Sequence, residues 1–525
     1  MTRWAMVADI DRCVGCQTCT AACRHSNATS PAVQWRKVLD VEAGAYPNVS
    51  RTFVPVGCQH CADPPCMHVC PSTATRQRAD GIVTIDYDIC IGCAYCDVAC
   101  PYQARFKVDA PRLAYTNVAM EDEIQREEPR RVGVAQKCTF CSDRVDFGLA
   151  NGLSVGLDPR ATPACVNACI ADALHFGDLD DPNSNVSKLL NSHRHFRMHE
   201  ELGTEPGFYY LYGAATAPQL ENPAPTARQG PVALRTKGVA PWHQQHWDWK
   251  AAANFICGGA GAGLFTITAI CTQGPLLLLG LVALALVALG LFCVLMKIGR
   301  PRRFMYVLRQ PRRSWMAREA WIACALFPVG LAATCFDASA LRFAGALVAL
   351  AYLFSQAMIL QAARGIPAWR TPLMSPLIVA TGIAEGSALL LVAAALWTPL
   401  QPARAAVMMI AVLTTALRAG IWYAYLSALR REGAPRRSLA VLEAFGPWFF
   451  AFGLALPLGA IVAGLLITAA TPILFALAGA AIAAAGAALK CLLVTRAGYN
   501  QGFALTHTPV RGSGIAGPAV KPGWT

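Results

Sequence analysis

The chain has 525 residues, of which 55% are hydrophobic and only 15% are charged. Ordinary soluble domains carry about 25% charged residues, so this composition excludes disorder and disfavours a fully soluble protein. The net charge of +13 is uneven: residues 1–250 hold 24 Lys and Arg against 27 Asp and Glu, whereas residues 251–525 hold 21 against 5. Because the basic half is also the apolar half, the charge does not indicate nucleic-acid binding.

Sixteen of the 22 cysteines lie between Cys13 and Cys169. Dense cysteine can build a disulfide framework in a small secreted domain. Residues 1–12 contain neither an apolar signal segment nor a twin-arginine motif, so we expect a chain that is not secreted. Dense cysteine in such a chain indicates metal binding.

The cysteine spacings point to iron–sulfur clusters. The first three clusters of cysteines read C-x2-C-x2-C-x3-C, C-x2-C-x4-C-x3-C-P and C-x2-C-x2-C-x3-C-P, and the fourth is split into two pairs. The run ending in Cys-Pro is the bacterial ferredoxin signature. Structural zinc is the alternative, but it needs two CxxC pairs and not repeated triplets. Sixteen ligands predict four 4Fe–4S clusters. The predicted ligands are Cys13, Cys16, Cys19, Cys23, Cys58, Cys61, Cys66, Cys70, Cys90, Cys93, Cys96, Cys100, Cys138, Cys141, Cys165 and Cys169.

The predicted fold joins two classes of structure. Residues 1–200 form an α+β ferredoxin-like iron–sulfur domain of two dicluster units, with no nucleophile–base constellation and no glycine-rich phosphate loop. The proline-rich residues 201–250 are predicted to be a covering loop or linker. Residues 251–497 form an all-α membrane bundle, and residues 498–525 form a tail. The iron–sulfur half is therefore expected to conduct electrons and not to act on a substrate.

Eight apolar runs in the second half are long enough to span a bilayer. Buried core helices are the alternative, but no soluble domain needs eight helices that are apolar all round. The predicted spans are 252–273, 275–296, 318–335, 341–362, 374–397, 404–428, 442–468 and 471–494.

Basic residues predict the orientation of these spans. The loops after spans two, four and six, together with the tail, hold 17 Lys and Arg, whereas the other side has only Arg342 and Arg404. The positive-inside rule places the basic side in the cytoplasm, and an even number of spans places residues 1–250 there too. We expect a multi-pass protein of the bacterial inner membrane. Some of these arginines could instead pair with a bound partner.

Several stretches resemble a known family. Residues 58–106, with CTFCSDR at 138–144 and PACVNACIADALHFGDL at 163–179, resemble the iron–sulfur subunit of DMSO-reductase-type molybdoenzymes. In the second half, GRP, SWMARE and IPAW resemble loops of the anchor subunit. Ile170 stands where proline often follows the last cysteine, and the gap from Cys141 to Cys165 is long. These departures indicate another branch of the family.

The resemblance implies two subunits fused in one chain. It implies a separate molybdopterin catalytic subunit and electron exchange with membrane menaquinone or ubiquinone. The branches include sulfite dehydrogenase, phenylacetyl-CoA oxidoreductase and DMSO reductase, and a cytoplasmic domain favours the first two. By analogy with two-cluster ferredoxins, the fourth cysteine of each motif binds the neighbouring cluster. The implied ligand sets are Cys58, Cys61, Cys66 with Cys100; Cys90, Cys93, Cys96 with Cys70; Cys13, Cys16, Cys19 with Cys169; and Cys138, Cys141, Cys165 with Cys23.

A quinone site needs polar groups near the basic side of the membrane. No histidine lies inside a predicted span, so haem is not expected. Interface contacts and helix-dipole compensation are the simpler explanations for the candidate residues. The candidates near this surface are His243, His246, Trp247, Arg318 and Glu319.

Two ionisable residues lie deeper, at matching depths of spans five and six. Glu385 and Arg418 are predicted to form an ion pair, either structural or part of a proton path. Lys490 is expected to extend toward the membrane surface. Three alternative functions follow: a proton-translocating module of a respiratory complex, a freestanding ferredoxin:quinone oxidoreductase, and a transporter with an iron–sulfur sensor. Sensing needs only one cluster, which argues against the last.

Overall fold

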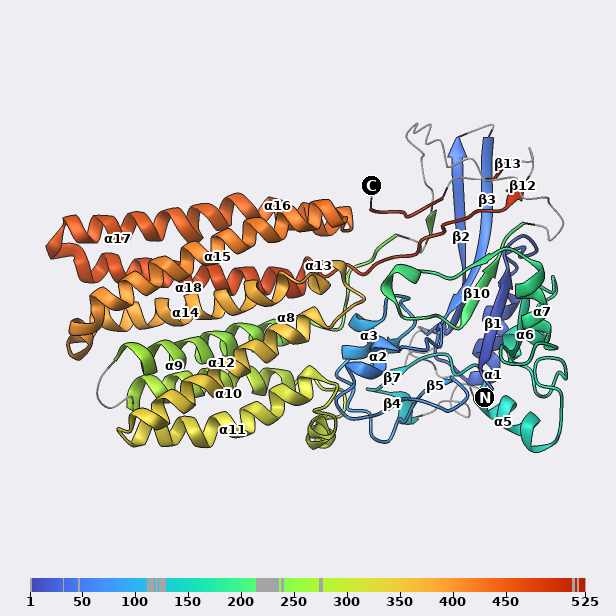
Figure 1. Ribbon diagram of the computed structural model, residues 1–525, viewed down its shortest axis with the longest axis horizontal. Helices are drawn as coiled ribbons and strands as arrows, with labels where there is room; N and C mark the ends of the chain where they lie inside the picture. The colour runs from blue at the N-terminus through green and yellow to red at the C-terminus, as the bar shows by residue number, and fades with distance from the viewer. Residues whose placement is uncertain are drawn as a thin grey trace. The chain divides into compact units, whose positions relative to one another are not determined.

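The structure is a computed structural model in which the chain forms two compact units (Figure 1). The first unit comprises Met1–His68, Thr73–Trp242 and Gln501–Thr525, and the second comprises Val69–Ser72 and His243–Asn500. The structure describes residues 2–31, 33–45, 48–110, 118, 121, 129–213, 236–237, 240–272, 277–511, 515–516 and 519–524.

A four-stranded sheet organises the first unit, in the order β8-β1-β10-β9. Its central strand β1 (Trp4–Asp9) runs antiparallel to β8 (Leu174–Asp178) and parallel to β10 (Phe208–Leu211). The short strand β9 (His195–Phe196) completes the edge. Because β10 lies within residues 201–250 and pairs with the first strand, that segment is not a linker throughout; its residues 214–235 and 238–239 lie outside the described residues.

A second sheet has the order β11-β2-β3. Strands β2 (Arg36–Ala45) and β3 (Asn48–Gly57) are antiparallel, with Arg36 opposite Gly57, and β11 (Thr236–Lys237) pairs with β2. Gly57 directly precedes Cys58, the first cysteine of the second motif, so this pairing places Arg36 beside that motif. Three two-stranded antiparallel sheets complete the strands of the described residues: β4 (Thr75–Gln77) with β5 (Val83–Ile85), β6 (Phe106–Lys107) with β7 (Ala135–Gln136), and β12 (Val510–Arg511) with β13 (Ile515–Ala516).

Short helices begin within the cysteine motifs. Four of them carry candidate ligands: α1 (Thr18–Asn27), α2 (Pro65–His68), α3 (Tyr95–Ala99) and α6 (Ala164–Asn167). Two others, α5 (Ser142–Ala150) and α7 (Asn185–Ser192), belong to the same unit.

The second unit is all-helical, and its described residues include eight helices long and apolar enough to cross a membrane, as the sequence predicts. The first span is interrupted by a π-helical turn at Asn254–Gly258, and the seventh by another at Ala451–Ala455. The helices are α8 (Trp249–Ala253) with α9 (Gly259–Cys271), α10 (Leu277–Leu295), α11 (Trp315–Cys335), α12 (Ser339–Gln361), α14 (Met374–Leu396), α15 (Arg404–Glu432), α16 (Arg436–Phe450) with α17 (Leu456–Leu466), and α18 (Thr471–Thr495); a short α13 (Pro367–Arg370) precedes α14.

The seventh span begins earlier than the predicted residue 442. Helix α16 starts at Arg436, because two arginines and Ser438 form its first turn ahead of the apolar residues. Hydrophobic runs identify only the part of a helix that faces lipid or core, so they miss such polar first turns.

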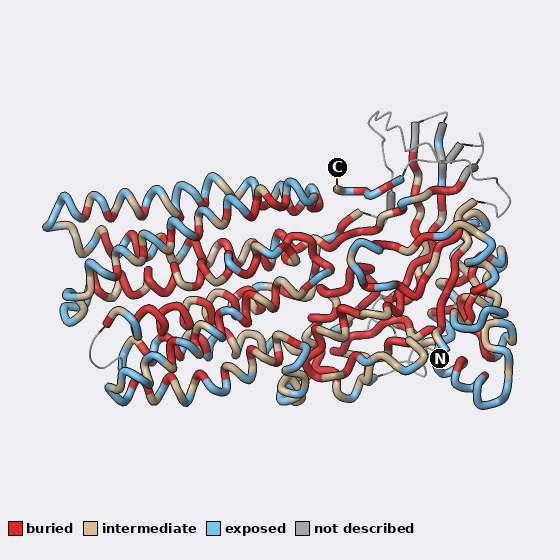
Figure 2. Tube along the Cα trace, viewed as in Figure 1, coloured by how far each residue is buried: buried red, intermediate tan, exposed pale blue. Residues whose placement is uncertain are grey.

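Helices α9 and α14 lie at the centre of the bundle. The apolar windows of the spans that contain them are 72% buried, whereas those of α10, α15 and α16–α17 are 28% buried. Figure 2 shows the exposed residues along these outer helices. A β-carbon on Gly263 would lie 2.0 Å from the Gly382 carbonyl oxygen, so the two central helices cross with their backbones in contact.

Candidate functional site

Four equivalent turns hold the candidate ligands of the first unit. In the first Cys-x-x-Cys pair of each motif, the residue before the second cysteine has a left-handed backbone: Gly15 (φ 72°), His60 (φ 42°), Gly92 (φ 71°) and Phe140 (φ 54°). Left-handed turns direct successive N–H groups into one concavity, a device that suits anionic iron–sulfur clusters. The side chains of two such residues, His60 and Phe140, stack with ring centroids 3.7 Å apart.

One cavity is lined by cysteines from two motifs. It is a partly open space of about 320 Å³, which includes adjoining solvent, and its lining includes Cys58, Cys61, Cys66 and Cys100. Burial raises the pKa of the Cys61 thiol well above its ordinary value, and its three cysteine neighbours add to the increase. Burial likewise raises the pKa of Cys100 to about 12. Four buried thiolates would repel one another unless a cationic centre lies among them.

A second group of cysteines converges from the first and fourth motifs. Asn27 Nδ2 donates to Cys23 Sγ at 3.8 Å and to Cys141 Sγ at 3.7 Å, so one amide joins the two motifs. Burial raises the pKa of Cys23, and the thiolates of Cys138 and Cys165 raise it further. These four cysteines form one of the sets implied by the resemblance.

The remaining cysteines are less closely connected. The Ala173 amide donates to Cys169 Sγ at 3.2 Å, and an Arg12–Asp172 ion pair at 3.3 Å joins the segments that contain Cys13 and Cys169. Cys16 is exposed. In the set implied for the third motif, Cys70, Cys90 and Cys96 are buried and Cys93 is half-buried, and their grouping stays a prediction.

The cavity suits a group larger than a single ion. Within the described parts of the chain, no three His, Cys, Asp or Glu side chains converge on one metal ion. Arg105 Nη2 donates to Cys66 Sγ at 2.8 Å, and its Nη1 donates to Thr75 Oγ1 at 3.0 Å. A fully buried guanidinium on a cysteine sulfur fits an anionic cluster held by thiolates. The residues present therefore fit a 4Fe–4S cluster.

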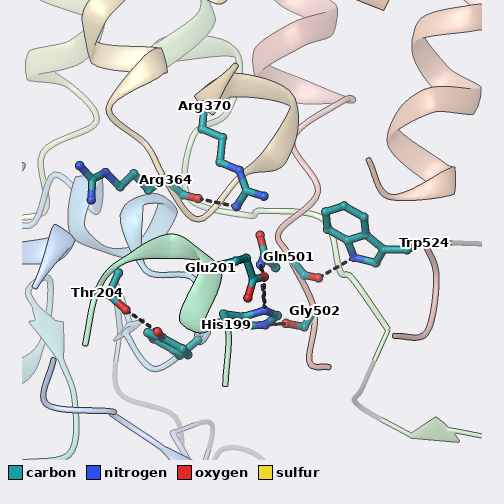
Figure 3. A network of polar contacts seen from close by, with 9 residues as sticks. His199, Glu201, Thr204, Arg364, Arg370, Gln501, Gly502 and Trp524 are labelled. Carbon is teal, nitrogen blue, oxygen red and sulfur yellow. Dashed lines mark hydrogen bonds and ion pairs between the residues drawn. The ribbon is translucent and has the colours of Figure 1, made fainter. Parts of the chain in front are cut away.

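The chain's C-terminal segment forms polar contacts with His199 of the same unit (Figure 3). His199 Nε2 donates to the Gly502 carbonyl oxygen at 3.1 Å, and Gln501 Nε2 lies 2.9 Å from His199 Nδ1. Tyr102, which lines the cavity, lies 6.0 Å from the His199 ring and hydrogen-bonds to Thr204. The predicted tail is thus part of the iron–sulfur unit.

Comparison with known proteins identifies the class. The family described as a 4Fe-4S dicluster domain matches residues 49–121. The chain is 41% identical over 221 residues to a selenate reductase subunit of Mesobacillus selenatarsenatis, covering 40% of this chain and 72% of the relative. It is 42% identical over 227 residues to a putative dimethyl sulfoxide reductase iron–sulfur subunit of Halobacterium salinarum, covering 41% and 80%. It is 36% identical over 227 residues to a sulfite dehydrogenase subunit of Allochromatium vinosum, covering 40% and 83%.

The fold, the cysteine turns and these matches together define an iron–sulfur electron-transfer protein with 4Fe–4S clusters. More narrowly, the chain belongs to the family of reductase iron–sulfur subunits. The relatives match only its N-terminal 40%, and the rest is the helical bundle.

The first and last residues of the second unit pair with each other, and predicted surface residues of the quinone site lie there. His243 pairs with Tyr499 in an isolated bridge, and its Nε2 is buried without a hydrogen-bond partner in the described part of the chain. Burial lowers the pKa of His243. Trp247 is buried and stacks on Trp369, with ring centroids 5.6 Å apart. His246, which lies beside Trp247 in the chain, is half-buried.

Glu319 lies in a buried polar cluster that the sequence pattern alone does not reveal. Asn254 Nδ2 donates to Glu319 Oε1 at 3.1 Å, from the π-helical turn of the first span. Gln356 Nε2 donates to the Asn254 carbonyl oxygen at 3.0 Å and to Tyr352 Oη at 3.4 Å. π-helical turns release backbone groups from the regular ladder and often occur at functional sites. The only sequence signal for this cluster was the presence of polar residues within spans one and four: Asn254, Tyr352 and Gln356.

The predicted Glu385–Arg418 ion pair is wrong. Lys490 Nζ donates to Glu385 Oε2 at 2.6 Å, with both side chains buried, so Lys490 does not extend to the surface. Arg418 instead donates to the carbonyl oxygens of Ile482 (3.0 Å) and Gly453 (2.9 Å). The π-helical turn at Ala451–Ala455 supplies the second of these acceptors. The prediction relied on the equal depths of Glu385 and Arg418 in their helices. Depth alone could not show whether α15 or α18 presents the partner of Glu385.

Arg318 has a structural set of contacts. Its Nε and Nη2 donate to the carbonyl oxygens of Pro311 (2.8 Å) and Arg312 (2.7 Å). Its guanidinium also lies 4.2 Å from the ring centroid of Trp315. These bonds fix the loop before α11 and so position the neighbouring Glu319.

Proposed function

We propose that this chain is the electron-transfer and quinone-reactive membrane-anchor subunit of a molybdopterin oxidoreductase complex, of the sulfite dehydrogenase, phenylacetyl-CoA oxidoreductase or DMSO reductase type. One observation carries the proposal: a single chain combines a cavity lined by four cysteines with eight helices able to cross a membrane. The relatives are named as subunits of reductases and dehydrogenases, which supports a separate catalytic partner.

The first unit would hold four 4Fe–4S clusters in the interleaved sets described above. When bound, each cluster accepts and returns one electron. The protein supplies thiolates, N–H groups and exclusion of water. The four left-handed turns support the count of four, because every motif has the same backbone device.

Electrons would pass to or from the catalytic partner at the first motif. Cys16 is exposed, and Val14, in the same motif, and Ile170, which follows Cys169, are 57% and 73% exposed. A cluster held here would lie close to the surface, as transfer to a second polypeptide requires. The exposed apolar side chains would be covered by that partner.

Quinone would bind on the side of the membrane where the basic loops lie. Glu319 offers a buried acceptor for a quinol hydroxyl, Asn254 offers a buried donor for a quinone oxygen, and Trp247 and Trp369 offer an apolar wall. His243 and His246 lie before the first span and would exchange protons at this surface. Arg318 would act only by positioning Glu319.

A proton-translocating module is the second candidate, and the buried Glu385–Lys490 pair favours it. A β-carbon on Gly259 would lie 2.3 Å from Lys490 Nζ and 3.5 Å from Gln356 Oε1. These two atoms are close enough for one bridging water, and Gln356 Oε1 has no hydrogen-bond partner among the described residues. Such a water would connect the Glu319 cluster with the Glu385 pair. Arg418, the other cation near Glu385, would stabilise the negative charge of Glu385 at the inner end of the proton path.

We further propose that the membrane is the bacterial inner membrane and that the basic side, with residues 1–250, faces the cytoplasm. The cluster unit would include the C-terminal segment from Gln501, and the membrane unit would comprise the helices. A tag after residue 525 should be labelled only when the cytoplasmic face is accessible, and labelling from outside would contradict this orientation.

Affinity purification in mild detergent tests the proposed function. We expect a molybdopterin polypeptide to accompany the chain, together with about 16 iron atoms per chain, since each of four clusters holds four. Replacing Glu319 by Gln should slow quinol-linked turnover while the iron content stays unchanged. A fully loaded chain that purifies without a partner would favour the freestanding ferredoxin:quinone oxidoreductase.

A further inference from the structure

Three buried cations of the first unit lack a carboxylate partner among the described residues. Arg36, Arg105 and Lys137 are 0%, 3% and 1% exposed. In the described part of the chain, no Asp or Glu forms an ion pair with any of them, whereas the less buried Arg78 pairs with both Asp80 and Asp146. A buried charge without a counter-charge is strongly unfavourable, so a negative group must compensate it.

Arg105 lies against candidate cluster ligands. Its Nη2 donates to Cys66 Sγ at 2.8 Å, and it lines the cavity of that ligand set. Burial lowers the pKa of Arg105, but the thiolates of Cys66 and Cys96 outweigh burial and raise it. Cys66 and Cys96 belong to the two different ligand sets of motifs two and three. Arg105 therefore contacts one cluster position of that pair and lies within electrostatic range of the other.

Arg36 has the corresponding place in the other pair of motifs. Its Nη2 donates to Met6 Sδ at 2.8 Å, and its Nε and Nη1 have no hydrogen-bond partner among the residues that the structure describes. Burial lowers the pKa of Arg36, but the thiolates of Cys165, Cys138 and Cys19 raise it overall. Cys19 belongs to one implied ligand set, and Cys138 and Cys165 belong to the other.

The neighbouring backbone makes room for this side chain. A β-carbon on Gly57 would lie 3.1 Å from Arg36 Nη1 and 2.8 Å from the Trp35 carbonyl oxygen. Phe208 lies beneath the guanidinium, with 5.0 Å between Arg36 Cζ and its ring centroid. The guanidinium is thus held in a closely packed position that no described carboxylate shares.

We propose that Arg105 and Arg36 set the reduction potentials of the clusters, with one arginine serving the two clusters of each pair of motifs. Each cluster gains one electron and no proton on reduction, and the electron comes from quinol or from the catalytic partner. An arginine stays protonated in both states, so it stabilises the reduced, more negative cluster more than the oxidised one. Lys137 lies beside a third candidate ligand, because its Nζ donates to the Cys138 carbonyl oxygen at 2.5 Å.

This inference rests on the proposed cluster positions, and iron analysis separates the two claims. The test is an EPR-monitored redox titration of the full chain with its co-purified partner in detergent. We expect Arg105→Gln and Arg36→Gln each to reduce the equilibrium constant for reduction of two clusters at least tenfold. A tenfold change is a downward shift of about 59 mV for a one-electron couple. The other two clusters should keep their potentials.

Arg78→Gln is the matched control, because it removes an arginine of the same unit whose partners are Asp80 and Asp146. Unchanged potentials in Arg105→Gln at full iron content, or an equal shift in Arg78→Gln, would overturn the proposal. Should Arg105→Gln lose iron, Arg105→Lys decides the question, because it keeps the charge and loses the forked contact with Thr75 and Cys66. Potentials close to those of the wild type in the lysine variant support the proposal, because the charge is retained. A tenfold or larger fall in the equilibrium constant despite the retained charge would refute it.

Discussion

The buried pair Glu385–Lys490 makes Lys490 a sensitive residue of the membrane unit. The two side chains are 1% and 0% exposed, and Arg418 is committed to carbonyl oxygens. Lys490→Met would leave a buried carboxylate without its partner, which costs about 3–5 kcal/mol. We expect a clear fall in the unfolding temperature measured in detergent. The double variant Lys490→Met with Glu385→Leu should recover most of the loss, and a single variant as stable as wild type would contradict the pairing.

Glu201 gives the docked C-terminal segment an acid-sensitive contact. Its hydrogen bond with His199 lowers the pKa of this carboxyl to about 2 from an ordinary 4.5. A depressed carboxyl pKa stabilises the fold above about pH 4.5, and this stability is lost as the pH falls toward 2. The protection factors of the backbone amides of residues 501–509 against hydrogen exchange should therefore fall as the pH falls through that window. Glu201→Gln should abolish the dependence; an identical profile in the variant would exclude this carboxyl.

The local cysteine pattern predicts where the candidate ligands are, but it cannot predict the cations beside them. Arg105 is five residues from Cys100, and nothing in its neighbourhood distinguishes it from a surface arginine. Its contact with Cys66 depends on how the chain returns over a separation of 39 positions. The same limit explains the wrong partner for Glu385, since the choice between Arg418 and Lys490 is made by the packing of three helices.

The crossing of α9 and α14 depends on small residues. A β-carbon on Gly263 would lie 2.0 Å from a backbone oxygen of Gly382, so the helices would have to separate. We expect Gly263→Ala to destabilise the bundle by about 1–3 kcal/mol, as overpacking does. Gly420→Ala is the matched control, because a β-carbon there meets nothing within 4 Å; it should stabilise α15 by up to about 1 kcal/mol. Equal unfolding temperatures for the two variants would show that this crossing is not tight.

The interleaving of cluster ligands between motifs two and three can be tested separately. Because Cys100 lies with Cys58, Cys61 and Cys66 around one cavity, Cys100→Ser should perturb the same EPR signal as Cys58→Ser. Cys90→Ser should perturb a different one. If Cys100→Ser instead matched Cys90→Ser, each motif would hold its own cluster and the interleaving would be wrong.

The eight helices of the second unit were accessible from the sequence because each is a long apolar run, which needs no knowledge of its neighbours. The polar first turn of α16 was not, because its residues do not extend the apolar run. The π-helical turn at Asn254 was not, because its side-chain partners are distant in sequence. The return of residues 501–509 to the first unit was missed for the same reason: Gln501 and His199 are 302 residues apart.

At the scale of the whole molecule, one chain is proposed to conduct electrons between its clusters and membrane quinone. The most direct test is to reduce the clusters of the purified chain in lipid nanodiscs with dithionite, remove the excess, and add a quinone. We predict rapid reoxidation of all clusters, slowed by Glu319→Gln at unchanged iron content. Fully loaded clusters that stay reduced after quinone is added would contradict this function. Equally fast reoxidation in Glu319→Gln would also contradict it, because electrons would then bypass the proposed quinone site.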